Sequence, residues 1–326
     1  MAATNSPRAL WHLSSAESRL LPTTSAAPVD GVRVRAAYSL ISTGTERLVA
    51  CGQVPLSLYD TMRVPHQEGT FAFPLTYGYS WVGRVDQPGH QAHGRWVHLL
   101  HPHQDWAHVA PSDWTLVPED IPPLRASLAS NLETAVNAVW EVPVSLGDRV
   151  LVMGFGIIGS LLARLLTQLP GVDLAILETQ TARRELAIEM GFELADSSPR
   201  TPYDVVFNTT ARAAALQHGL DHLGREGALV ELSWYGQQSI ELRLGAAFHQ
   251  RRQRLISSQV SQLPPARRPR WDYQRRKALV FELLRQAHWD AHLRECIAFE
   301  ALPDFFEQLR AGHQPMLGVA VDYGQE

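Results

Sequence analysis

The chain is poor in cysteine, in lysine and in long apolar runs. Cys51 and Cys296 are its only cysteines, too few for a disulfide framework or a four-cysteine zinc site. Lys277 is its only lysine, which excludes a P-loop lysine or a Schiff-base lysine before it. No segment approaches the ~20 apolar residues of a membrane span, and residues 1–28 lack the apolar run of a secretory signal. We therefore expect a cytoplasmic protein that does not enter a membrane.

Neither sign of charge dominates, and the composition is that of a globular protein. The formal net charge of −4 argues against bulk binding of nucleic acid or of a membrane surface. Hydrophobic residues make up 45% of the chain and charged residues 19%, which are globular values. A chain of 326 residues is long for one hydrophobic core, so two domains are expected.

Residues up to about Pro123 form short extended runs separated by proline and glycine. Apolar and polar residues alternate in Val32–Ala36 and in Trp81–Val85, and Arg95–Leu100 is a further extended run. A period of two is typical of strands with one buried face. The first domain is therefore predicted to be mostly β-structure.

After residue 123 the pattern becomes an alternation of helices and strands. A helix is predicted over Leu124–Glu141. The predicted strands are Arg149–Met153, Leu174–Leu177, Val205–Asn208, Ala228–Leu232 and Leu255–Ser258. Helices are predicted between them at Ser160–Gln168, Thr181–Met190, Ala211–Leu223 and Gly245–Arg252. This alternation is typical of a doubly wound parallel sheet, with the last strand expected at its edge.

The composition also marks two joints between domains. Pro118–Pro123 and Leu263–Pro269 are rich in proline, as linkers are. Beyond the second joint the pattern predicts the helices Tyr273–Gln286 and Ala301–Ala311 and the terminal strand Met316–Asp322. The expected segments are therefore 1–123, 124–262 and 263–326.

The most informative motif is a glycine-rich turn between a predicted buried strand and a predicted amphipathic helix. Its residues are Gly154, Phe155, Gly156, Ile157, Ile158 and Gly159. In a turn of this kind the first glycine permits the tight bend and the second lets the backbone approach a pyrophosphate. The third lets the helix pack closely on the strand, and the helix start offers N–H groups to phosphates. The motif predicts dinucleotide binding; the alternative is a turn whose glycines serve packing alone.

Charged residues after the next strand indicate which dinucleotide is preferred. Glu178 ends that strand, where a carboxylate accepts the ribose hydroxyls of NAD and repels the 2′-phosphate of NADP. Arg183 and Arg184 follow and would suit such a phosphate. Because Glu178 argues the other way, NAD(H) is expected to be favoured over NADP(H). Arg183, Thr209 and Ser233 complete the predicted cofactor-binding residues.

Four segments of the predicted β-rich domain carry a family resemblance. Ile41–Glu46, Pro74–Val85, Arg95–Val97 and Trp106–Val109 resemble the "I-C-G-T-D", "P-x-x-x-G-H-E-x-x-G-x-V", "G-D-R-V" and "A-E-Y-V" segments of the medium-chain dehydrogenase/reductase superfamily, the alcohol dehydrogenase-like proteins. Ile41–Leu48, followed by Gly78-Tyr79 and Val82–Val85, is most similar to its bacteriochlorophyllide dehydrogenase branch. The resemblance implies an α/β protein, in which a GroES-like β-rich substrate domain holds an inserted Rossmann domain. Residues 263–326 would then return to the substrate domain.

The chain departs from this family at the catalytic zinc site. The positions that resemble the family's zinc ligands hold Thr43, Tyr79, Ser80 and Glu133. Neutral hydroxyls bind zinc poorly, and one carboxylate does not hold it alone. No metal is therefore predicted. The alternative is a relocated site among His98, His101, His103 and His108, where His101 and His103 alternate on a strand-like stretch.

Without a metal, other groups must act on the oxygen of the substrate. The predicted catalytic residues are Thr45, Tyr79, Glu133 and His101. Thr45 falls where the resemblance places a proton-relay hydroxyl, and Tyr79 would direct a phenol into the same cavity. Each has an ordinary alternative: a turn or cap hydroxyl for Thr45, aromatic packing for Tyr79, and an acid in the first turn of a helix for Glu133. Glu46 is expected to hold an arginine such as Arg47 or a backbone group.

Arginine-rich runs follow the predicted parallel sheet. One of them, Arg275-Arg276-Lys277, is interpreted as part of a solvated face, with a site for an anionic substrate as the alternative.

Three functions are consistent with these residues. The first is a zinc-independent dehydrogenase that interconverts a secondary alcohol and a ketone on a small-molecule substrate. The second is a quinone or enoyl reductase that acts on an activated double bond, and the third is a dinucleotide-binding protein without catalysis. The hydroxyl of Thr45 favours the first. Family resemblance also predicts a homodimer that pairs through Leu255–Ser258.

Overall fold

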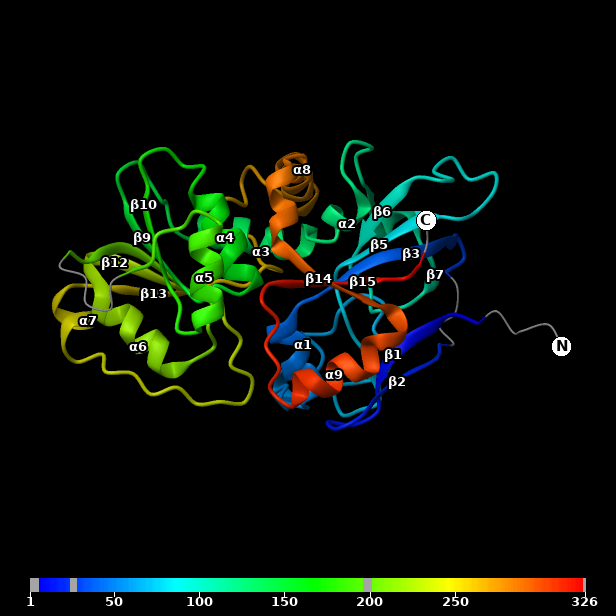
Figure 1. Cartoon of the computed structure of the whole chain (residues 1–326), viewed down its shortest axis with the longest axis horizontal. Coiled ribbons are helices and arrows are strands. Elements are labelled where there is room, and N and C mark those ends of the chain that lie inside the picture. The colour runs from blue at the N-terminus through cyan, green and yellow to red at the C-terminus, as the bar shows by residue number, and fades with distance from the viewer. Residues whose placement is uncertain (1–5, 24–27, 196–200, 325–326) are drawn as a thin grey trace. The chain divides into compact units, whose positions relative to one another are not determined.

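The computed structural model describes residues 6–23, 28–195 and 201–324 (Figure 1). The chain divides into two compact units. Unit 1 comprises Met1–Ser130 and Phe281–Glu326, and unit 2 comprises Asn131–Val280. The domain limits expected from the sequence, 1–123, 124–262 and 263–326, are not the limits of these two units, and they stay a prediction.

Unit 1 is built on a seven-stranded sheet around β3 (Val32–Ile41). The order is β14 (Leu293–Ala298), β15 (Gly318–Asp322), β3, β5 (Trp81–Val85), β6 (Trp96–Leu99) and β8 (Trp114–Leu116), and β7 (Trp106–Val109) also pairs with β3. β15 pairs antiparallel with β3, with Val319 opposite Ile41, so the end of the chain completes a sheet that the first hundred residues begin.

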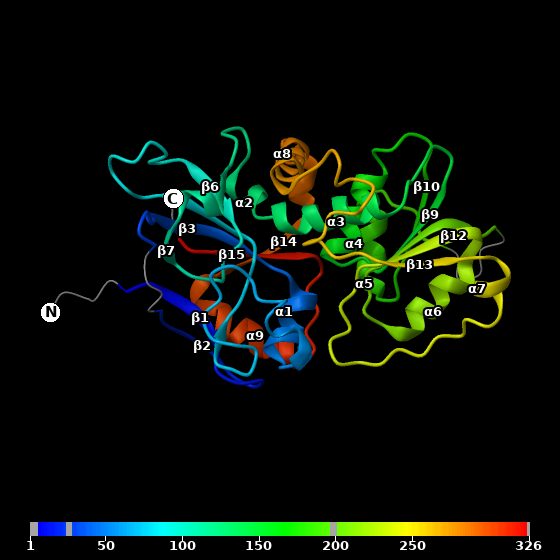
Figure 2. The same cartoon turned by 180° about the vertical axis from the view of Figure 1, so that it is seen from behind.

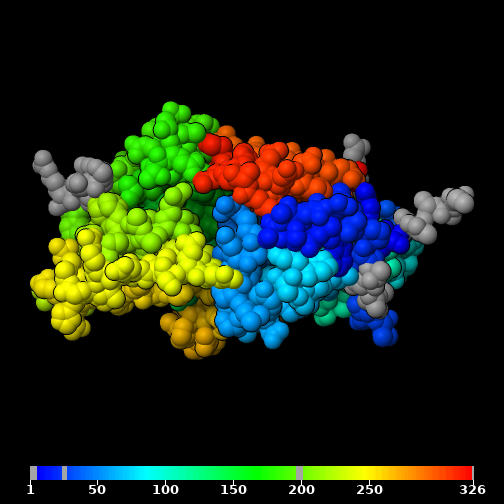
Figure 3. All heavy atoms as spheres, turned by 90° about the horizontal axis from the view of Figure 1, so that it is seen from below, coloured from blue at the N-terminus to red at the C-terminus, as the bar shows by residue number. Residues whose placement is uncertain are grey.

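A second sheet and a helix cover the core of unit 1. The three-stranded sheet has the order β2 (Ser18–Pro22), β1 (Arg8–His12) and β4 (Leu75–Thr76). Helix α9 (Leu302–Arg310) lies beside the β1–β2 hairpin on the surface (Figure 3). Its apolar side chains join Leu10, Ile41 and Val319 in one buried cluster. This cluster supports α1 (Thr43–Ala50), which begins where β3 ends.

Unit 2 contains a five-stranded parallel sheet, seen from both sides in Figures 1 and 2. The order is β10 (Asp173–Leu177), β9 (Arg149–Met153), β11 (Tyr203–Asn208), β12 (Leu223–Glu231) and β13 (Arg254–Ser257). The chain leaves β9 first toward β10 and later toward β11, which is the strand order of a doubly wound sheet. β13 lies at the edge of this order, as predicted.

Two helices of unit 2, α4 (Ile157–Leu166) and α6 (Ala213–His222), pack on these strands. The others are α3 (Ala129–Glu141, whose first two residues belong to unit 1), α5 (Thr181–Glu189), α7 (Ala247–Gln250) and α8 (Tyr273–Leu284, whose last four residues belong to unit 1). Leu151 and Met153 of β9 pack with Leu216 and Leu220 of α6 in one buried cluster. These alternate residues share a face because side chains along a strand point to opposite sides.

The structure corrects one predicted helix and adds strands. The helix expected over Leu124–Glu141 is two helices, α2 (Pro123–Ala126) and α3, because a turn at Ser127 and Leu128 interrupts it. The Ser127 hydroxyl donates to the carbonyl of Leu124 at 2.7 Å, a local bond that competes with helix continuation. No strand was predicted from the sequence at the positions of β1, β2 and β14.

Across the described ranges, no helix has the length and apolar character needed to cross a membrane.

Candidate functional site

The glycine turn, Gly154–Gly159, joins β9 to α4 at the carboxyl end of the parallel sheet. Gly156 is the residue before the first turn of α4, so the free N–H groups of that helix point toward the turn. β9 lies between β10 and β11, where the chain changes its direction of winding. Ligands of doubly wound sheets bind at this point, outside the carboxyl ends of the strands.

The three glycines have different surroundings. A Cβ on Gly159 would lie 2.0 Å from the carbonyl oxygen of Gly154, so helix and turn are in direct contact there. Gly154 has a φ of +91°, and a Cβ on it would lie 2.8 Å from Oγ1 of Thr209. A Cβ on Gly156 would find nothing nearer than Nη1 of Arg183 at 3.8 Å. The space in front of Gly156 is therefore open, as backbone approach to a pyrophosphate requires.

Glu178 follows β10 and is 7% exposed. Its Oε2 accepts the N–H of Phe155 in the glycine turn at 2.8 Å. Its Oε1 accepts the N–H groups of Thr179 at 2.6 Å and Gln180 at 2.9 Å. A carboxylate has about four lone-pair sites, so these three bonds leave room for a ribose hydroxyl. Glu178 thus fixes the shape of the glycine turn as well as offering an acceptor beside it.

The arginines after Glu178 lie near the same turn. Arg183 is half-buried, and burial lowers the pKa of its guanidinium, while the nearby Glu178 carboxylate acts in the opposite direction. Arg184 donates from Nη1 to the carbonyl oxygen of Glu178 at 3.2 Å. The structure thus brings Glu178, Arg183 and Gly156 together, as the sequence predicted for one binding site.

Thr209 and Ser233 follow β11 and β12 at the same edge of the sheet. The Thr209 hydroxyl donates to the carbonyl of Met153 at 2.9 Å, next to the glycine turn. Ser233 accepts the N–H of Ala211 at 2.9 Å, which links the two loops that follow the strands.

Beside these two residues lies a polar network that was not predicted from the sequence. Asn208, fully buried at the end of β11, donates to Oε2 of Glu231 at 2.7 Å. Tyr235 donates to the same oxygen at 3.0 Å, and Oε1 of Glu231 accepts the N–H of Ser233 at 2.7 Å. Polar residues that end successive parallel strands were the available signal, because strand ends meet at one edge of a sheet.

In unit 1, the hydroxyls of Ser42 and Thr45 meet the phenol of Tyr79. We call these three residues the hydroxyl cluster. Ser42 precedes α1, Thr45 lies in its first turn, and Tyr79 lies between β4 and β5. The side chains of Ser42 and Thr45 hydrogen-bond to the Tyr79 phenol. Burial, and after it the Glu46 carboxylate, raises the pKa of Tyr79 to about 12, although both hydroxyls act to lower it. The structure thus brings Thr45 and Tyr79 together, with a phenol that stays protonated near neutral pH.

Glu46 lies beneath the hydroxyl cluster and is 0% exposed. Its Oε1 accepts the N–H of Ser42 at 2.7 Å, and its Oε2 pairs with Nε2 of His103 at 2.8 Å. The expected backbone partner is therefore confirmed. The expected arginine partner is wrong, because Arg47 is exposed and donates to the carbonyl of Leu309 instead.

Glu133 lies in unit 2 with two cationic partners. Its Oε2 pairs with Nζ of Lys277 at 2.5 Å, and its Oε1 with Nε of Arg276 at 3.3 Å. Arg276 also donates to Oδ1 of Asn137 at 2.9 Å, and its side chain is 5% exposed. The interpretation of Arg276 and Lys277 as a solvated face is therefore wrong, since both bind a buried carboxylate. A catalytic role for Glu133 stays a prediction.

Three of the four histidines of the proposed metal alternative, His98, His101 and His103, have separate partners. His98 contacts the hydroxyl of Ser80 at 3.2 Å, and His103 pairs with Glu46. His101 donates from Nδ1 to the carbonyl of Pro102 at 2.9 Å, and burial lowers its pKa to about 3. His101 and His103 lie between strands rather than on one, so the strand-like stretch expected there is wrong. The catalytic role of His101 stays a prediction.

The side chains at the family's zinc positions do not suit that ion. Tyr79 is engaged in the hydroxyl cluster, and the hydroxyl of Ser80 donates to the carbonyl of Ser127 at 2.6 Å. Glu133 already pairs with two cations, which would repel a third. Within the described part of the chain, no three histidine, cysteine or acidic side chains are grouped to hold a metal ion.

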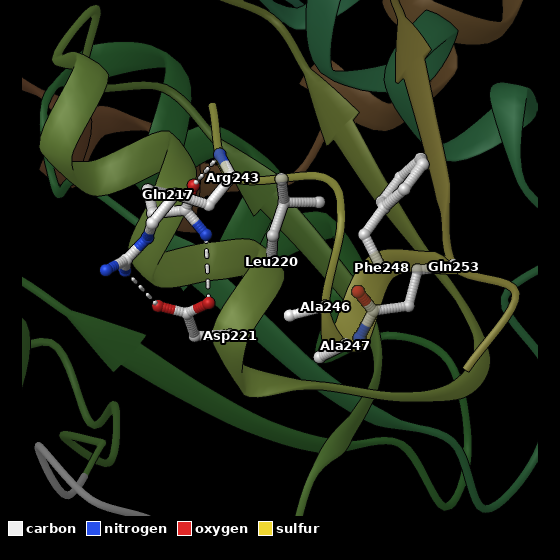
Figure 4. A pocket seen from close by; sticks show the side chains of 8 residues that line it. All are labelled: Gln217, Leu220, Asp221, Arg243, Ala246, Ala247, Phe248 and Gln253. Carbon is white, nitrogen blue, oxygen red and sulfur yellow. Dashed lines mark hydrogen bonds and ion pairs between the residues drawn. The ribbon is translucent and has the colours of Figure 1, made fainter. Parts of the chain in front are cut away.

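Two hollows lie elsewhere in the molecule. One of about 200 Å³ lies beside α6 and α7 in unit 2, where Asp221 bonds to Gln217 and Arg243 (Figure 4). The other, of about 130 Å³ in unit 1, is lined by His66, His101 and His108 among others. Neither is lined by the glycine turn or the hydroxyl cluster, so we assign no cofactor to them.

Comparisons with known proteins agree with this geometry. No protein-family model matches the chain. Over 229 residues it is 26% identical to the 2-desacetyl-2-hydroxyethyl bacteriochlorophyllide A dehydrogenase of Rhodobacter capsulatus. This match covers 61% of the present chain and 64% of the relative. Over 189 residues it is 24% identical to the D-guloside 3-dehydrogenase of Escherichia coli. That match covers 53% of the present chain and 54% of the relative. The chain thus matches less than two thirds of the length of these curated relatives.

The fold is shared with solved structures over almost the whole chain. The acetophenone reductase of Geotrichum candidum in complex with NAD matches with a TM-score of 0.76 at 14% identity, over 99% of this chain and 98% of that one. The predicted fold class, a GroES-like β-rich part with a Rossmann parallel sheet, is confirmed. The chain therefore shares the fold of this structure, and in sequence it is similar to two proteins named as dehydrogenases.

Proposed function

We propose that the protein is an NAD-dependent, zinc-independent oxidoreductase that interconverts a secondary alcohol and a ketone by hydride transfer. The observation that carries the proposal is the glycine turn, with open space at Gly156 and the Glu178 carboxylate beside it. Both curated relatives are named as dehydrogenases, one of a hydroxyethyl bacteriochlorophyllide and one of a D-guloside. The substrate is proposed to be a small molecule.

The chain's own residues divide the work between binding and proton handling. The N–H groups at the start of α4 would hold the pyrophosphate, and Glu178 would hold the adenosine ribose. When bound, NAD supplies the hydride acceptor. The Tyr79 phenol, protonated near neutral pH because its pKa is raised, would give its proton to the substrate oxygen during ketone reduction and take it back during alcohol oxidation. Thr45, hydrogen-bonded to that phenol, would relay the proton.

An assay with NADH separates this function from the two alternatives. Reduction of ketones to secondary alcohols by NADH, together with oxidation of those alcohols by NAD, supports the proposal. Reduction of quinones or enones alone would assign the protein to the reductases of activated double bonds. NADH binding without turnover of any of these would favour a protein that binds the dinucleotide without catalysis.

Glu178 is expected to set the cofactor preference. The intact protein should bind NADH more tightly than NADPH, because the carboxylate repels a 2′-phosphate. Glu178→Ala should narrow this gap on the order of tenfold, the equivalent of about 1.4 kcal/mol. Glu178→Gln is the matched control, since it removes the charge and keeps an acceptor for the N–H of Phe155. Calorimetric titration measures both affinities, and equal affinities of the intact protein for the two dinucleotides would disprove the preference.

Zinc is expected to be dispensable. Protein purified without chelator should carry well under one zinc per chain, and its activity should survive EDTA, because hydroxyls replace the soft ligands. Elemental analysis and a parallel assay measure this. Stoichiometric zinc would overturn the prediction and direct attention to the histidines between residues 98 and 108.

The chain is also expected to form a homodimer through β13. This strand is an edge of the parallel sheet, and Leu255 on it is 39% exposed. An unpaired edge strand can pair with its copy across a two-fold axis. Sedimentation should therefore give twice the chain mass of 36.3 kDa. A monomer at micromolar concentration would contradict this assembly.

A further inference from the structure

A chain of buried hydrogen bonds runs beneath the hydroxyl cluster in unit 1. Nε2 of His103 pairs with Glu46 at 2.8 Å, and Nδ1 of His103 bonds to the hydroxyl of Ser39 at 2.7 Å. Ser39 bonds in turn to the phenol of Tyr323 at 2.9 Å. The side chains of His103 and Glu46 are each 1% exposed. The segments involved lie far apart in sequence, since Tyr323 follows the last strand of the chain.

The carboxylate fixes the direction of the bond between His103 and Glu46, and the directions of the other two bonds follow when the imidazole is neutral. A carboxylate only accepts hydrogen bonds, so Nε2 of His103 donates to Glu46. In the neutral imidazole, Nδ1 then accepts from Ser39, whose oxygen accepts from Tyr323. Each member holds the next in one orientation. The end of this chain is Oε1 of Glu46, which accepts the N–H of Ser42 at the start of α1.

Stability alone does not account for this arrangement. Removing a carboxylate and an imidazole from water costs free energy, and apolar residues of similar volume often stabilise a core equally well. A fully satisfied buried network does, however, fix geometry closely. The geometry fixed here is that of Ser42 and Thr45, the two side chains that hydrogen-bond to the Tyr79 phenol.

We infer that His103 is a positioning residue for the oxidoreductase site: by holding Glu46, it fixes the turn that presents the hydroxyls of Ser42 and Thr45 to Tyr79. The inference rests on the proposed function for its effect on turnover. Its structural part, the link from His103 to the environment of Tyr79, is independent of any substrate.

The test compares two buried histidines of the same unit. His12 is 0% exposed and packs on Phe306 with ring centroids 4.9 Å apart, while His103 faces the same ring at 6.4 Å. The hydrogen bonds of His12 go to Ser18 and Arg310 rather than to Glu46. His12→Leu is therefore a matched control for the loss of a buried imidazole in this core.

His103→Leu should lower kcat on the order of 10²-fold, the cost of a small misplacement near the reacting groups, with the Kd for NADH unchanged. His103→Gln should restore most of the rate, because its amide can donate to Glu46. His12→Leu should keep kcat even where its melting temperature falls as much. Equal losses of kcat in both leucine variants, or full activity in His103→Leu, would overturn the inference.

A second readout works without substrate. In protein labelled with ¹³C at the tyrosine ring, the Tyr79 signal is assigned by its absence in Tyr79→Phe. That signal should shift in His103→Leu, return in His103→Gln and stay in place in His12→Leu. If these shifts occur but no secondary alcohol is oxidised, the positioning role holds and the proposed function fails. An unshifted Tyr79 signal in a folded His103→Leu variant would disprove the positioning role itself.

Discussion

Replacing Gly156 with valine should abolish NAD(H) binding and leave the protein folded. A Cβ at this position meets nothing nearer than 3.8 Å, so a substitution here does not push the turn away from α4 as it would at Gly159. The valine side chain would occupy the space through which the pyrophosphate approaches the backbone. We expect the Kd for NADH to rise at least ~100-fold, equivalent to about 2.7 kcal/mol, with a nearly unchanged melting temperature. Calorimetry and thermal unfolding of the same preparation measure the two quantities.

Gly159→Val provides the contrast within the same turn. A Cβ there would lie 2.0 Å from the carbonyl oxygen of Gly154, so helix α4 would have to move away from the turn. This variant should lose stability as well as binding, as overpacked sites do. Tight NADH binding by Gly156→Val would show that the dinucleotide does not lie across this turn.

Tyr79→Phe should lower kcat by about 10²–10⁴-fold, the range that a general acid contributes, with little change in the Kd for NADH. The variant removes one hydroxyl and keeps the ring, which contacts Tyr77 edge-on with centroids 6.0 Å apart. Tyr79 belongs to unit 1 and the glycine turn to unit 2. Steady-state rates at saturating ketone and NADH, with an independent NADH titration, measure both effects.

Tyr77→Phe is the control for the loss of a neighbouring phenol. Tyr77 is 2% exposed and burial raises its pKa well above the ordinary value. It should tolerate the change with its kcat within a few-fold of the intact protein. If Tyr79→Phe retains full turnover, Tyr79 is a packing residue and the proton is handled elsewhere.

The sequence by itself determined the parts of this protein that depend on short-range order. Strands β5 and β9 have the predicted limits, because alternation or a buried apolar run is a property of neighbouring residues. The same kind of local pattern predicted the glycine turn, Glu178 and the parallel sheet. The spacing of glycines and of strand ends can be seen directly in the order of the residues.

Only the tertiary structure decided which side chains meet across long separations. Glu133 pairs with Lys277, and Glu46 with His103, because folding brings segments together that share no periodicity in sequence. The partners of a buried charge are set by desolvation and hydrogen bonding in the packed core, and neither leaves a pattern along the chain.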